Sequence, residues 1–238
     1  MNKGFYNNLD ENFEQAFELS EKHFSHSELI ELLKNGNIPQ KQIAALKFDY
    51  VQNEQDALAL LSNLTGCDGK IREAVALRTN QILNESENVK FIFSKISAEI
   101  LADASIDINA NICRLAIDSA ILLKFDVDFS SKYTDKLLFY TKEALSELDK
   151  FIFRDKKYVI NKQIFKLYWC LEGIKYFQEF IENEELKKIL IKCAEQKEYT
   201  IREKAAQIIV MSEKFQNLKN KLSNDENYYV RNIFSQIN

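Results

Sequence analysis

Apolar residues recur every three or four positions along most of the chain, and short polar turns separate the runs that they form. The segment from Asn8 to Phe24 is an example, because Leu9, Phe13 and Phe17 fall on one side of a helix. Comparable runs predict further helices over residues 27–34, 39–51, 55–64, 71–83, 89–101, 110–124, 132–153, 158–181, 184–195, 201–211, 214–222 and 228–237. We therefore expect an all-α chain built from consecutive helix pairs.

A short motif begins the second helix of several pairs. It is present at Asp68…Ile71-Arg72…Ala74, at Glu198…Ile201-Arg202…Ala205 and, in reduced form, at Glu226…Val230-Arg231. An acid near a helix N-terminus interacts favourably with the helix dipole, and a β-branched residue packs on the preceding helix. Alanine lets two helices approach closely. We expect each arginine to reach an acid in a neighbouring turn.

This motif resembles that of HEAT repeats, and the resemblance extends over about residues 27–238. It implies a right-handed α-α superhelix of five to six HEAT-like helix pairs in a single continuous domain. Residues 1–26 then form an N-terminal capping helix. Two central units depart from the motif, because Cys113 and Asn161 stand where the arginine is expected.

Composition supports the helical assignment and restricts the chemistry. One proline and five glycines are too few for a turn-rich sheet protein. The four cysteines have no C-x-x-C spacing, which favours reduced core thiols over a zinc or redox site. The N-terminus has no secretory signal pattern, and no run approaches the ~18 apolar residues of a membrane span. We therefore expect a cytoplasmic protein that does not enter a membrane.

Charge is distributed unevenly along the chain. The formal net charge of −4 gives no general attraction to nucleic acid. Residues 1–119 carry 11 Lys+Arg against 18 Asp+Glu, a net −7, whereas residues 120–238 carry 21 against 18, a net +3. This asymmetry can orient a partner, although most of these charges are expected to face solvent on helix surfaces.

No motif for catalysis is present. The chain lacks G-x-S-x-G, P-loop, dinucleotide-binding and H-E-x-x-H patterns. Its two histidines, His23 and His26, would share a helix face with Glu28 nearby, but Ser25 and Ser27 indicate a helix boundary there. We predict neither a metal site nor a cofactor, and an interaction module rather than an enzyme.

Aromatic residues concentrate in the centre of the chain, where residues 125–180 hold 14 of the 28. Helix 158–181 has one apolar stripe that includes Ile164, Leu167 and Leu171. Its opposite side carries aromatic and basic residues, namely Lys162, Phe165, Lys166, Trp169, Tyr176 and Phe180. Two interpretations are open: the helix is buried by both neighbouring repeats, or this side is an exposed strip that binds a peptide, a helix or stacked bases.

We predict a non-catalytic scaffold that binds a protein partner along a concave surface lined by the second helices. The candidate binding residues are Arg78, Arg114, Lys162, Phe165, Lys166, Trp169, Glu172 and Tyr176. The alternative is a DNA-binding protein, since the chain resembles HEAT-like alkylpurine DNA glycosylases in length and helical pattern. Those enzymes use a tryptophan and an acid beside a basic groove, and Trp169 and Glu172 would take these roles. The acidic balance of the chain disfavours this alternative.

Overall fold

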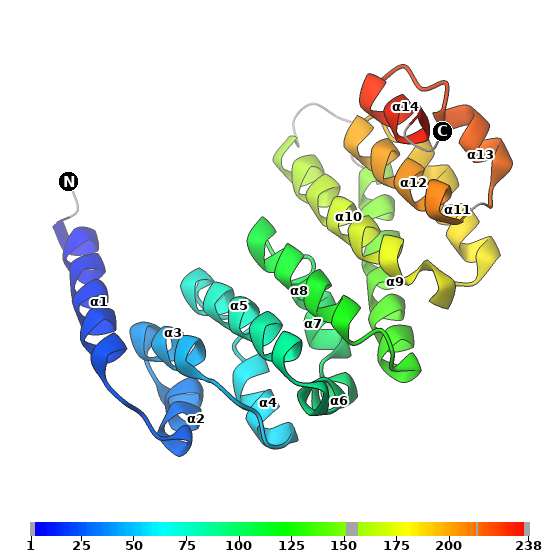
Figure 1. The fold of residues 1–238 in the computed structure, drawn as a ribbon. Helices are drawn as coiled ribbons and strands as arrows, with labels where there is room; N and C mark the ends of the chain where they lie inside the picture. The colour runs from blue at the N-terminus through cyan, green and yellow to red at the C-terminus, as the bar shows by residue number, and fades with distance from the viewer. Residues whose placement is uncertain (1–2, 151–156, 213, 236–238) are drawn as a thin grey trace. The chain divides into compact units, whose positions relative to one another are not determined.

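The computed structural model describes the backbone of residues 3–150, 157–212 and 214–235, and the side chains of residues 11–150, 161–212 and 214–235. These residues are all-α, as predicted, and no strand occurs among them (Figure 1). In chain order the helices are α1 (Lys3–Glu21), α2 (His26–Asn35), α3 (Ile38–Lys47), α4 (Glu54–Leu61), α5 (Gly69–Glu85), α6 (Glu87–Ile96), α7 (Ala98–Ala104), α8 (Ala110–Leu122), α9 (Val127–Lys150), α10 (Lys157–Phe177), the 3-10 helix η2 (Gln178–Phe180), α11 (Asn183–Ala194), α12 (Tyr199–Ser212), α13 (Gln216–Leu222) and α14 (Tyr228–Ser235). The chain divides into two compact units, residues 1–129 (unit 1) and residues 130–238 (unit 2).

In unit 1 the second helices of successive pairs pack on one another. Helix α3 lies against α5, α5 lies against α8, and α1 lies against α3, where a capping helix is expected. Each of the three stacked helices buries an alanine, Ala44, Ala74 or Ala116, and these small side chains permit close helix contact. Asp68 caps α5, as its place in the motif predicts, by accepting the backbone N–H of Lys70 at 2.9 Å.

The predicted helix over residues 89–101 is wrong in one respect, because Ser97 divides it into α6 and α7. The buried stripe runs through the break, because Val89, Phe93, Ser97 and Leu101 are buried at a spacing of four residues. The backbone hydrogen bonds from Ser97 N–H to the Phe93 carbonyl and from Leu101 N–H to the Ser97 carbonyl keep the helical spacing of four residues. Both segments therefore turn the same side toward the core of unit 1.

Unit 2 repeats the arrangement, with α10 against α12 and α12 against α14. At Gly173 a Cβ atom would lie 2.6 Å from Leu137 Cδ1 and 3.2 Å from Tyr133 Oη, so α9 and α10 approach closely there because this side chain is absent. Helix α9 begins at Val127 instead of residue 132, and Asp126 caps it through the N–H groups of Asp128 and Phe129. Residues 151–153, which the sequence predicts as helical, lie outside the described part of the chain.

Two of the three turn arginines reach an acid in a neighbouring turn, as predicted, whereas Arg231 donates to the backbone carbonyls of Asp225 and Glu226 in its own turn. In unit 1, Arg72 Nε lies 2.8 Å from Asp107 Oδ2 in the turn before α8. In unit 2, Arg202 Nε donates to Asp225 Oδ2 at 2.7 Å, and its Nη2 donates to Oδ1 at 3.0 Å. The hydrogen bond between them raises the pKa of Arg202 and lowers the pKa of Asp225. These arginines therefore connect successive turns of the fold.

The paired, consecutive packing of helices agrees with the predicted fold class. The handedness of the superhelix, the number of pairs and the extent of a single continuous domain stay predictions. Within the described residues, no helix is long and apolar enough to cross a membrane.

Candidate functional site

The predicted aromatic residues of α10 are less accessible than an exposed binding strip requires. Trp169 retains only 8% of its surface, and Phe165 packs edge-on against it with ring centroids 6.2 Å apart. Phe165 and Tyr176 are half-buried, and Lys162 is exposed. The indole Nε1 of Trp169 is buried and has no hydrogen-bond partner within the described residues. Trp169 is therefore mainly part of the packing of unit 2.

Three charged residues of α10 form ion pairs within unit 2, namely Lys166, Glu172 and Lys175. Lys166 Nζ lies 2.6 Å from Glu143 Oε2 and 4.4 Å from the centroid of the Tyr140 ring. Glu172 accepts from Lys175 at 2.5 Å and also from Lys204, a buried lysine of α12. The α10 charges thus stabilise contacts to the neighbouring helices α9 and α12.

The pKa values of the Glu172–Lys204 pair follow from these contacts. Burial acts to raise the pKa of Glu172, but the hydrogen bonds from Lys175 and Lys204 outweigh it and lower that pKa. Burial likewise acts to lower the pKa of Lys204, and the hydrogen bond to Glu172 reverses the direction. A carboxylate held by two lysines is a poor candidate for proton transfer. This arrangement disfavours the glycosylase alternative, which needs an accessible acid beside Trp169.

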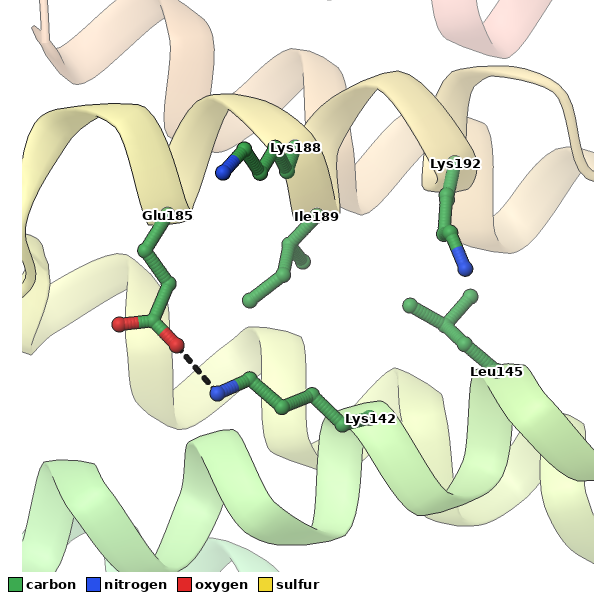
Figure 2. A pocket seen from close by; sticks show the side chains of 6 residues that line it. All are labelled: Lys142, Leu145, Glu185, Lys188, Ile189 and Lys192. Atoms are coloured by element: carbon green, nitrogen blue, oxygen red, sulfur yellow. Dashed lines mark ion pairs between the residues drawn. The ribbon is translucent and has the colours of Figure 1, made fainter.

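A groove in unit 2 between α9 and α11 was not predicted from the sequence (Figure 2). It has a volume of about 340 Å³ and is lined by Lys142, Leu145, Glu185, Lys188, Ile189 and Lys192. Figure 2 shows Leu145 and Ile189 projecting into the space between the helices. The ion pair between Lys142 and Glu185 connects α9 to α11. The available sequence signal was the i, i+4 spacing of Lys188 and Lys192 beside Ile189 on one helix face.

The two predicted arginines of unit 1 have different surroundings. Arg114 is exposed on α8. Arg78, on α5, is half-buried and lines a cavity of about 500 Å³ together with His23 and His26. Ser25 caps α2 through a reciprocal pair of hydrogen bonds with Glu28, which confirms the helix boundary predicted between the histidines.

Metal and thiol chemistry find little support in the described part of the chain. It holds no group of three or more His, Cys, Asp or Glu side chains placed to bind a metal ion. All four cysteines are free thiols, and Cys113, Cys170 and Cys193 are buried. Burial raises the pKa of both Cys170 and Cys193 to about 12, which leaves these thiols protonated and unreactive near neutral pH.

Comparison with known proteins gives a fold-level likeness only. No family model matches the chain, and no curated protein matches it. It is similar to the crystal structure of an engineered protein from the Northeast Structural Genomics Consortium, with a TM-score of 0.46, 12% identity, and coverage of 90% of this chain and 95% of that one. It is also similar to an archaeal HEAT-like repeats protein from Thermococcus onnurineus NA1, with a TM-score of 0.47, 10% identity, and coverage of 90% and 78%.

Proposed function

We propose that this protein is a non-catalytic binding module and that the α9–α11 groove of unit 2 takes an acidic, amphipathic segment of a partner protein. The observation that carries the proposal is the composition of the groove. Leu145 and Ile189 form an apolar floor, with 2% and 4% of their surfaces exposed, and three lysines surround it (Figure 2). An apolar floor with a basic rim is complementary to a helix that carries apolar and acidic residues on one face.

The charges around the groove favour an acidic partner. Three of its lining residues are lysines and one is a glutamate, a net charge of +2 by formal count. Lys192 also lies 3.7 Å from Asp149, but both side chains are largely exposed and solvent screens this pair. Such rim charges set the orientation and the association rate of a partner more than its final affinity.

The length of α11 limits the size of the partner. Helix α11 has 12 residues and is about 18 Å long. This length suits a partner helix of about three turns, with an aliphatic anchor over Ile189 and acids on either side.

The proposal is tested with a fluorescein-labelled peptide that forms an amphipathic helix with leucine anchors and flanking glutamates. We expect saturable binding by fluorescence anisotropy, and about tenfold or greater weakening by Lys188→Glu combined with Lys192→Glu. A peptide with the same leucines and lysines in place of the glutamates should bind much more weakly. Equal binding of the two peptides would refute the proposal.

A second variant separates this groove from the surface predicted on α10. Lys162 is exposed on α10, so Lys162→Glu introduces a charge change without disturbing a buried contact. Peptide affinity should stay within about twofold of the unmodified protein if the groove alone binds. A loss equal to that of the double groove variant would instead favour the α10 surface, where Phe165 and Tyr176 are half-buried and still accessible.

A further inference from the structure

A cavity in unit 1 lies where the turn between α1 and α2 meets the end of α3 and the middle of α5. It has a volume of about 500 Å³. Its lining comprises Lys22, His23, Phe24, His26, Leu29, Leu46, Lys47, Asp49, Tyr50 and Arg78. Three of these residues are permanent cations and one is a carboxylate, so the formal charge of the lining is +2 with neutral histidines.

Two cations of this cavity, Arg78 and Lys47, form hydrogen bonds with neutral oxygens. Arg78 donates through Nε to the backbone carbonyl of Phe48 and through Nη1 to Gln81 Oε1 at 3.2 Å. Lys47 Nζ donates to the carbonyl of Lys22 at 2.6 Å. Within the described residues, no carboxylate forms an ion pair with Arg78 or Lys47. Carbonyl oxygens fix the positions of these cations and leave their charge available to an anion.

Aromatic rings line the cavity beside these cations. The imidazole of His26 stacks on Phe48, with centroids 5.1 Å apart, and on Tyr50, with centroids 4.2 Å apart. Its Nε2 lies 3.1 Å from the buried carboxylate of Asp56, which fixes the ring. Tyr50 is the accessible end of this group, since 43% of its surface is exposed. A ring bound in the cavity can stack on Tyr50 while its anionic group meets the cations.

We propose that this cavity binds a small aromatic anion, a single planar ring that carries a phosphate or carboxylate group. The anionic oxygens would contact Arg78 and Lys47, and the ring would lie against Tyr50. A cavity of this size suits a small molecule. A long polyanion such as nucleic acid fits less well, because residues 1–119, with this basic cluster included, carry a net charge of −7.

Three probes test the proposal on the full chain: phenyl phosphate, benzoate and inorganic phosphate, each titrated by calorimetry at constant ionic strength. We expect saturable binding of one aromatic anion per chain. Inorganic phosphate should bind more weakly, since it has no ring to stack. Tighter binding of phenyl phosphate or of benzoate identifies which anionic group the cavity prefers.

Matched variants locate the binding. Arg78→Gln should weaken the aromatic probe about tenfold or more, whereas Arg114→Gln removes the same charge from an exposed site of unit 1 and should have no effect. Tyr50→Ala should weaken the aromatic probes and leave inorganic phosphate unchanged. If Arg78→Gln alters the helical circular dichroism, Lys47→Gln takes its place in the test. The proposal is overturned if none of the probes saturates, or if Arg114→Gln weakens binding as much as the cavity variants.

Discussion

The basic residues of α10 in unit 2 and those of the cavity in unit 1 lie beside aromatic rings in both places, but their partners differ. Lys166 meets the carboxylate of Glu143, and the buried Lys204 of α12 meets that of Glu172. Among the residues that the structure describes, Arg78 and Lys47 form hydrogen bonds with neutral oxygens only. A carboxylate neutralises a cation and joins two helices, whereas a carbonyl positions the cation and leaves its charge to a ligand. The partner of a basic residue therefore decides between a packing role and a binding role.

This contrast is local to the cavity and is not a property of unit 1 as a whole. Lys95 Nζ lies 2.7 Å from Asp126 Oδ2 in the same unit, and Asp126 also accepts from Ser94 Oγ at 2.8 Å. Unit 1 thus neutralises a lysine in the ordinary way where α6 meets the turn before α9. The cavity departs from that pattern at two neighbouring positions.

The largest expected effect tests the packing role assigned to α10. Trp169→Ala should lower the free energy of unfolding by about 3 kcal/mol, because a buried indole is replaced by a cavity. Urea unfolding followed by far-UV circular dichroism measures the change. Phe165→Ala, at a half-buried position, should cost less. A change below about 1 kcal/mol for Trp169→Ala would show that the indole is available to a partner.

The next prediction concerns a variant that removes the carboxylate paired with Lys204, so that this lysine, like the cations of the cavity, has no carboxylate partner. Glu172→Gln keeps the shape of the side chain but leaves Lys204 buried without its counter-ion, which should cost about 2 kcal/mol or more. Trp169 is the only tryptophan in the chain, so its fluorescence during urea unfolding reports on unit 2. Glu143→Gln is the matched control, since Glu143 is 49% exposed and its pair should contribute less than about 1 kcal/mol. Equal effects of the two variants would contradict the distinction.

The smallest expected effect is a pH dependence of the stabilisation by the Lys95–Asp126 ion pair of unit 1. The hydrogen bond from Lys95 lowers the pKa of Asp126 to about 2, against an opposing effect of burial. Because the folded pKa lies below the unfolded value of about 3.9, the stabilisation is complete above about pH 4 and is lost as the pH falls toward 2. Asp126→Asn should therefore lower the unfolding free energy by about 1–2 kcal/mol at pH 5, a value that allows for the exposure of Lys95.

The same measurement near pH 2 provides the check. There Asp126 is about half protonated in the folded protein, and most of the difference from Asp126→Asn should be lost. Urea unfolding by circular dichroism at both pH values gives the comparison. A difference that is constant with pH would assign the effect to lost capping of α9 instead of lost charge.

Local rules predicted most of the fold. The apolar spacing located the helices, Asp68 identified the start of α5, and two of the three turn arginines, Arg72 and Arg202, pair with an acid as expected. The break at Ser97 escaped prediction because buried positions 89, 93, 97 and 101 keep a helical spacing through it. A pattern of apolar positions does not mark such a break.

The candidate sites were harder to predict for the same reason. The aromatic face of α10 was visible in the sequence, but its charged partners are Glu143 of α9 and Lys204 of α12, 23 and 32 residues away. The availability of Arg78 depends on the Phe48 carbonyl, which leaves no trace in side-chain chemistry. Likewise, Leu145 and Ile189 are core positions, and only the placement of α9 beside α11 brings three lysines around them. Residue type was predictable, and accessibility required the tertiary contacts.

The Arg202–Asp225 contact makes the stability of α12 depend on the turn that leads into α14. Arg202 is buried in α12, and its counter-ion comes from the turn that leads into α14. If that turn opened, the buried guanidinium of Arg202 would lose its counter-ion. Opening of the turn therefore also destabilises α12. Nearest-neighbour coupling of this kind gives a repeat array its cooperativity. Here a single ion pair opposes unravelling from the C-terminal side.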